Sequence, residues 1–172
     1  HAALPDVPPA RVSGGDDKVV VDIGGRDVVE SAGYALFSIT LSSDHSSPIQ
    51  IRLGLLDGSA KIPGDFLSQM EFSADGENWS AVSDGLIELQ PGVVAAYVRV
   101  PVVNDQLHEN TEQFELTAKL VGGQALLAQS ASLIATSIVD DDATPVLKIS
   151  AIQPVLNEQA GVATFEVTLS AP

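Results

Sequence analysis

Acidic and amide side chains gather at a few points of this sequence instead of being spread evenly. They flank segments with an alternating apolar pattern, where loops are expected. Two carboxylates about 5 Å apart repel each other by roughly 3 kcal/mol at an effective dielectric constant near 20. A cluster of them should therefore hold a cation. The residues concerned are Glu30, Asp65, Asn104, Asp105, Glu109, Glu112 and the triplet Asp140, Asp141 and Asp142.

The chemistry of these side chains indicates Ca²⁺. All the candidate ligands are oxygens, and they are numerous enough for the roughly 6–8 oxygens that Ca²⁺ takes from flexible loops. Zinc prefers nitrogen or sulfur ligands, but the chain has no cysteine, and its histidines, His1, His45 and His108, are widely separated. An acidic loop can also be merely a solvated surface. Several clusters that all fall at predicted strand ends favour the metal site.

The elements that must position these residues are short strands. Phe37, Ile39 and Leu41 alternate with polar residues, and the same period of two recurs in 49–55, 94–100 and 114–120. This pattern is typical of half-buried strands, and Asp-Gly, Pro-Gly and Gly-Gly pairs separate the segments. We therefore predict an all-β fold, an immunoglobulin-like antiparallel β-sandwich. Loops at alternate connections of a sandwich lie at the same end, so distant acidic residues can meet there.

An internal repeat shows how the chain is organised. The segment 30–42 reappears as 158–170, with eight of the thirteen positions identical, and 19–21 aligns with 147–149 at the same spacing. We predict a proline- and glycine-rich linker over 1–17, a complete unit over 18–142, and a linker with the first two strands of a following repeat over 143–172.

Two strands alone do not bury a core. The segment 143–172 must therefore lean on the first unit, pair with another copy, or belong to a domain whose remainder lies outside this sequence. A tandem array is the simplest source of such a pattern, so the expected partners are neighbouring repeats of the same chain.

Composition excludes several functions. The 172 residues carry 8 basic and 23 acidic side chains, for a net charge of −15, which disfavours nucleic acid and anionic membrane surfaces. No stretch reaches the roughly 20 apolar residues needed to cross a bilayer, so we expect no direct membrane insertion. The absence of cysteine removes disulfides and thiolate catalysis.

Catalytic and nucleotide-binding motifs are also missing. There is no glycine-rich phosphate loop with its lysine, no EF-hand spacing and no serine in a nucleophile elbow. His108 and Glu109 begin a short pattern like that of a metalloprotease helix, but a glutamate, Glu112, stands where the second histidine would be. We therefore expect no enzymatic activity.

The order of these motifs resembles a Calx-beta domain over Lys18 to Asp142. The resemblance rests on ES-AG at 30–33, DGSA with GDF at 57–66, VPVVNDQLHENTEQF at 100–114 and IVDDD at 138–142. The sequence is similar especially to the Calx-beta-like extender repeats of giant RTX-type bacterial surface adhesins, which share the hairpin motif at 73–79. The sequence NEQAGVATFEVTLS at 157–170 looks like the opening of the next repeat.

The resemblance implies a set of Ca²⁺ ligands. Family members place them at the positions of Glu30, Asp65, Asn104, Asp105, the carbonyl of Leu107, Glu109, Glu112 and Asp140 to Asp142. This sequence departs from the family at Asn104 and Gln106, where strongly binding members have aspartates. The loss of two carboxylates should lower the affinity or the number of sites, so we expect one or two structural ions suited to millimolar external Ca²⁺.

The function expected from these features is a Ca²⁺-stiffened structural repeat in the stalk of a secreted adhesin on the bacterial cell surface, with a role in biofilms. Other domains of such a protein would bind the host or surface ligand. One alternative is a module that itself binds a sugar or peptide, which an exposed aromatic patch would favour. The other is a Ca²⁺ sensor, as the resemblance to exchanger domains implies.

Overall fold

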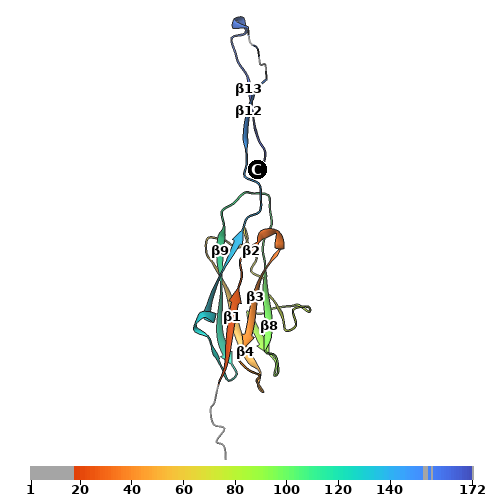
Figure 1. The fold of residues 1–172 in the computed structure, drawn as a ribbon, viewed down its shortest axis with the longest axis vertical. Coiled ribbons are helices and arrows are strands. Elements are labelled where there is room, and N and C mark those ends of the chain that lie inside the picture. The colour runs from red at the N-terminus through yellow and green to blue at the C-terminus, as the bar shows by residue number, and fades with distance from the viewer. Residues whose placement is uncertain (1–17, 153–154, 156, 172) are drawn as a thin grey trace, which may run out of the picture.

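Two β-sheets pack face to face in this protein, and a two-stranded hairpin extends beyond them (Figure 1). The computed structural model describes residues 18–152, 155 and 157–171. The predicted linker over 1–17 lies outside the described residues. The expected all-β sandwich is confirmed.

The larger sheet has six strands in the order β10-β1-β3-β8-β5-β6. Most neighbours run antiparallel, while β1 and β10 are parallel. The turn at 74–79 joins its last two strands, as the Asp-Gly pair at 75–76 predicts. The strands are β1 (Val19–Gly25), β3 (Tyr34–Leu41), β5 (Glu71–Ser73), β6 (Ser80–Ala81), β8 (Ala95–Pro101) and β10 (Ala125–Leu127).

The second sheet has five strands in the order β2-β11-β9-β4-β7. Its centre is formed by the two longest strands of the protein, which pair antiparallel. The strands are β2 (Val28–Val29), β4 (Ile49–Asp57), β7 (Leu86–Leu89), β9 (Glu112–Gly122) and β11 (Leu133–Val139).

The core fills the space between these two sheets. Alternate residues of each strand point inward, because successive side chains of a strand lie on opposite faces. Phe37 of β3, Phe114 of β9 and Phe66 are fully buried. The Phe66 and Phe114 rings stack with centroids 4.3 Å apart, and Phe37 meets Phe114 edge-on at 6.1 Å. These three rings tie the sheets together near the end where the acidic loops lie.

The polypeptide crosses from one sheet to the other between β1 and β2. Gly25 lies at this crossing, and a Cβ atom on it would lie 2.7 Å from Thr136 Oγ1, so only glycine fits. β2 then pairs in parallel with the end of β11. The short helix η1 (Glu30–Ala32) follows and is closed by Gly33, whose φ of 77° is in the region that favours glycine.

The hairpin contains β12 (Leu147–Ala151) and β13 (Phe165–Leu169), with the short helix η3 (Glu158–Ala160) between them. It follows the sandwich at the end where β11 finishes (Figure 1). The remaining short helix is η2 (Gln129–Ser132), before β11. Among the described residues, no helix is long and apolar enough to cross a bilayer.

Candidate metal centre

The first carboxylate cluster lies where the chain leaves the β2–β11 pair. Val29 and Val139 pair in parallel, so the residues that follow them, Glu30 and Asp140, emerge next to each other at the same end of the sheet. Asp142 comes one residue beyond the exposed Asp141. One carboxylate oxygen from each of Glu30, Asp140 and Asp142 lies within 4.8 Å of the others.

The second cluster contains Asp65, Glu109 and Glu112, whose ligand oxygens also lie within 4.8 Å of one another. Phe66 positions Asp65, because it forms an isolated antiparallel bridge with Val102 and stacks on Phe114 in the core. Glu112 is the first residue of β9. The cluster is therefore built from a core-anchored loop and the start of a central strand.

Buried oxygens without a hydrogen-bond partner distinguish both clusters from a solvated acidic surface. Only 3% of Glu30 is exposed. Buried polar atoms are nearly always hydrogen-bonded, so each exception requires an explanation. Within the described residues four buried side-chain oxygens lack a partner, and three of them belong to the clusters: Glu30 Oε1, Glu112 Oε2 and Asp142 Oδ2.

The electrostatics of the clusters are unfavourable without a cation. Burial raises the pKa of Glu30 to about 7, and the charges of Asp142, Asp105 and Asp140 add to this effect. Burial also raises the pKa of Glu112 to about 7, together with the adjacent Asp65 carboxyl. The pKa of Glu109 is raised as well, by burial and by four neighbouring aspartates.

Asp140 differs from these glutamates. Burial alone would raise its pKa, but hydrogen bonds from the backbone N–H groups of Asp142 and Glu109 and from His108 outweigh burial and lower it. Asp140 is therefore held as a carboxylate, which is the form that binds a cation.

The donor set fits Ca²⁺. Two oxygens on opposite sides of a Ca²⁺ ion are about 4.8 Å apart, because Ca–O distances are about 2.3–2.6 Å. The oxygens in each cluster are within this separation, and all six side chains are carboxylates. Neither cluster contains the nitrogen or sulfur ligands that zinc prefers.

The structure leaves four of the predicted ligands outside these two sets of side chains. Asn104, Asp105 and Leu107 are exposed in the loop between β8 and β9. Asp105 Oδ1 accepts a hydrogen bond of 2.7 Å from the Leu107 backbone N–H. Asp141 is exposed, and its Oδ2 accepts a hydrogen bond from Ser31 Oγ at 2.5 Å. Asp105 nevertheless borders the first cluster, since its backbone N–H hydrogen-bonds to the Glu30 carboxylate.

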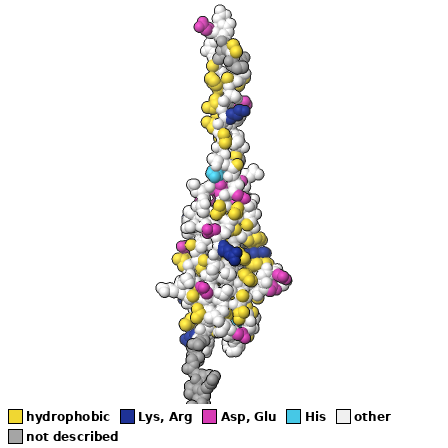
Figure 2. All heavy atoms as spheres, viewed as in Figure 1, with side chains coloured by type: hydrophobic (Ala, Val, Ile, Leu, Met, Phe, Trp, Pro, Cys, Tyr) yellow, Lys and Arg dark blue, Asp and Glu magenta, His cyan; other side chains and the backbone are white. Residues whose placement is uncertain are grey.

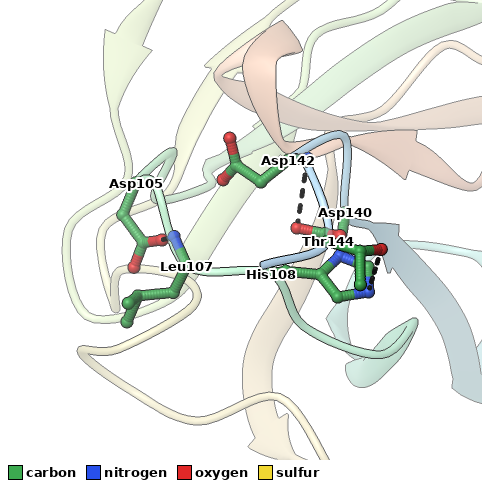
Figure 3. A network of polar contacts seen from close by, with 6 residues as sticks. All are labelled: Asp105, Leu107, His108, Asp140, Asp142 and Thr144. Carbon is green, nitrogen blue, oxygen red and sulfur yellow. Dashed lines mark hydrogen bonds and ion pairs between the residues drawn. The ribbon is translucent and has the colours of Figure 1, made fainter. Parts of the chain in front are cut away.

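Sequence reasoning missed the polar contacts that hold this end together (Figure 3). His108 Nδ1 lies 2.6 Å from Asp140 Oδ2, and its Nε2 lies 3.3 Å from Thr144 Oγ1. Ser31 of η1 bonds to Asp141. These contacts tie the β8–β9 loop and η1 to the segment that follows β11. No spacing rule predicts them, because the partners are far apart in sequence.

We expect His108→Ala to lower the free energy of unfolding by about 1 kcal/mol, because the variant loses the hydrogen bond between His108 Nδ1 and the Asp140 carboxylate. Urea denaturation at one pH and a fixed Ca²⁺ concentration measures the change. Gln106→Ala, in the same exposed loop, is the matched control and should have no effect. Equal losses in both variants would contradict a specific role for His108.

Comparison with known families decides the relationship. The model of the family described as Calx-beta domain matches residues 15–143. This chain belongs to the Calx-beta family. No curated protein matches the chain.

Solved structures agree with the Calx-beta fold. The apo-form Calx CBD1 domain is 22% identical with a TM-score of 0.57, and the match covers 73% of this chain and 100% of that one. The calcium binding domain CBD12 of CALX1.1 is 22% identical with a TM-score of 0.56, and the match covers 73% of this chain but only 45% of that one. The Calx CBD2 domain is 8% identical with a TM-score of 0.53, covering 71% and 86%.

The outer face of the six-stranded sheet in this Calx-beta unit carries an aromatic cluster. The guanidinium carbon of Arg99 lies 4.2 Å from the ring centres of both Tyr34 and Trp79. Arg99 Nε also donates a hydrogen bond of 2.5 Å to Glu71. Each ring therefore has one face covered by the arginine, an arrangement that stabilises the sheet surface and leaves less ring area for stacking on a sugar.

Proposed function

We propose that this protein is a non-enzymatic, Ca²⁺-binding structural repeat in the stalk of a secreted bacterial adhesin. The observation that carries the proposal is the pair of carboxylate clusters, with buried and unpartnered oxygens, at the sandwich end next to the hairpin. A cation would satisfy these oxygens and neutralise the charges around them. The solved CBD12 of CALX1.1 is itself described as a calcium binding domain.

The first cluster suggests how Ca²⁺ would stiffen the protein. Glu30 comes from η1, whereas Asp140 and Asp142 belong to the segment that leads out of the sandwich. An ion held by all three would fix that segment against the unit. Without the ion the carboxylates repel each other, and the direction of the outgoing segment is less restricted. A series of such repeats would then form a rod in the presence of Ca²⁺.

Localisation and partners follow from this proposal. Extracellular Ca²⁺ is millimolar, which suits sites with few carboxylates, so the proposed location is the bacterial cell surface. The proposed partners are neighbouring repeats of the same chain, while other domains would bind a host or surface ligand. The absence of cysteine fits this role if Ca²⁺ supplies the cross-links that secreted domains often take from disulfides.

Isothermal titration calorimetry with Ca²⁺ tests the two clusters separately. We expect Glu30→Gln and Glu112→Gln each to weaken one binding event at least tenfold, which is about 1.4 kcal/mol, because each variant loses a buried carboxylate ligand. Glu77→Gln is the matched control, because Glu77 is exposed in the β5–β6 turn. Wild-type protein that takes up no Ca²⁺ at millimolar concentration would overturn the proposal.

Stiffening is tested by distances between spin labels. The chain has no cysteine, so Glu77→Cys and Thr168→Cys place one label on the sandwich and one on the hairpin. We expect the distance distribution to narrow when Ca²⁺ is added, because the outgoing segment becomes fixed. A control pair within the sandwich, Glu77→Cys with Ser43→Cys, should not change. Identical widths with Ca²⁺ and with EDTA would contradict the stalk mechanism while leaving Ca²⁺ binding intact.

A further inference from the structure

The β12–β13 hairpin has one face that is entirely apolar. Its strands pair antiparallel, with Leu147 opposite Leu169, Ile149 opposite Val167 and Ala151 opposite Phe165. Alternation places all six side chains on one face, and Lys148, Ser150, Glu166 and Thr168 on the other. Figure 2 shows hydrophobic side chains along the hairpin. The five larger residues of the apolar face are 58–63% exposed.

Each residue of this face has an equivalent in the first unit. The spacing of 128 residues places β12 on β1 and β13 on β3. The equivalents of Ile149, Phe165 and Val167 are Val21, Phe37 and Ile39, and these three are fully buried in the sandwich core. The polar face corresponds in the same way to residues that are exposed in the first unit, Val20, Asp22, Ser38 and Thr40.

Local structure repeats along with the side chains. η3 lies 128 residues after η1, and Gly161 closes it at φ 69°, ψ −15°, close to the 77° and −15° of Gly33. Ser170 caps β12 through its hydroxyl and backbone N–H, as Ser42 caps β1. The pairing register differs by two residues, since repeating the β1–β3 register would place Ile149 opposite Leu169. A shift of two keeps the same side chains on the same face.

The first unit shows what covers such a face. Phe37 packs edge-on against Phe114 of β9 in the opposite sheet. At the strand edges, β1 pairs with β10 and β3 pairs antiparallel with β8. Among the described residues, β12 and β13 form a sheet of two strands only. The hairpin therefore presents an apolar face and two strand edges. In the first unit the equivalent face and edges, those of β1 and β3, are covered by other strands.

We propose that the hairpin is the first half of a second sandwich, and that its apolar face binds an amphipathic β-sheet equivalent to β2-β11-β9-β4-β7 of the first unit. This sheet would present a bulky apolar residue to Phe165, as Phe114 does to Phe37. A further strand of the same partner would pair antiparallel with β13, as β8 does with β3. This inference rests on the repeat and on burial, not on Ca²⁺ binding.

A chimera tests the proposal. Residue 172 is equivalent to residue 44 of the first unit. In the chimera, a second copy of residues 45–142 is therefore fused directly after residue 172 of the full chain. We expect hydrogen exchange of the peptide 165–169 to slow at least 100-fold relative to the 172-residue chain, because its strand becomes part of a closed sandwich. The hydrogen exchange of peptides from the first unit should not change. Unaltered exchange at 165–169 would overturn the proposal.

Paired variants in the chimera test the face itself. Val167→Asp, on the apolar face, should abolish the protection of 165–169 and of the appended strands, whereas Thr168→Asp, on the polar face, should retain it. A second chimera carries the first-unit residues Leu147→Val, Ile149→Val, Ala151→Ile and Val167→Ile. Protection in this version but not with the natural hairpin residues would overturn the proposal, because the natural face would then not fit such a sheet.

Light scattering of the 172-residue chain tests the competing occupant. We expect a monomer at micromolar concentration. A stable dimer that Val167→Asp converts to monomer, and Thr168→Asp does not, would assign the apolar face to a second copy and overturn the proposal.

Discussion

Saturating Ca²⁺ is expected to raise the Tm of the metal-free protein by about 10 °C. A ligand at 100 times its Kd stabilises the folded state by about 2.7 kcal/mol, and 1 kcal/mol shifts the Tm of a domain of this size by roughly 4 °C. The physical reason is that three buried oxygens, one each from Glu30, Glu112 and Asp142, have no hydrogen-bond partner. Each of them would coordinate a bound ion. Differential scanning calorimetry in EDTA and in rising Ca²⁺ measures the shift.

Three controls separate this effect from general screening of charge. Glu30→Gln should lose much of the Ca²⁺-dependent shift, whereas Glu77→Gln should keep it. Mg²⁺ should give a smaller shift, because it demands a tighter octahedral arrangement than these loop carboxylates provide. A Tm that is the same in EDTA and in millimolar Ca²⁺ would contradict the metal site.

Metal-free protein should become less stable as the pH rises from about 4.5 to about 7. Glu30 and Glu112 have folded-state pKa values near 7, above the ordinary value of 4.5. Within this window the folded state binds more protons than the unfolded state, so stability falls with increasing pH. One unit of pKa difference corresponds to about 1.4 kcal/mol. Because Glu112 is only half-buried and solvent screens part of its charge, we expect a total loss of about 2–3 kcal/mol.

Urea denaturation in EDTA at pH 5.0, 6.0 and 7.5 measures this dependence. Glu30→Gln together with Glu112→Gln should remove most of it, since a neutral amide does not titrate. Asp140 does not interfere, because its pKa is lowered and its contribution is lost only at more acidic pH. Equal slopes in the wild type and the double variant would show that other groups cause the pH dependence.

Much of the sandwich could be predicted from alternation alone. Phe37, Ile39 and their neighbours bury every second residue as the sequence indicates, because one face of each sheet meets the core. The strands β2 and β6 have only two residues each and carry no detectable period. The pairing of Val29 with Val139 could therefore not be foreseen, although it is what brings Glu30 beside Asp140.

The candidate site was predicted as a group of residues, but its division was not. The loop sequence from 104 to 112 places the carboxylates at one end of the sandwich, yet it does not separate Asp65, Glu109 and Glu112 from the other cluster. The place of Asp65 in the second cluster is set by the adjacent Phe66, which stacks on Phe114 in the core. The contact of His108 with Asp140 likewise depends on the path of the loop and not on residue spacing.

The parallel pairing of β2 with β11 also bears on mechanical load. β1 runs toward the end of the sandwich where β2 and η1 lie, and β11 leaves at that same end (Figure 1). A force that pulls residue 18 and residue 140 apart would draw the paired strands β2 and β11 in opposite directions along their length. The bonds of a parallel ladder are evenly spaced, so they would be loaded in shear together instead of opening one by one. Resistance to pulling is set by the unfolding rate, and an ion joining Glu30 to Asp140 would clamp the strand pair where that load is applied.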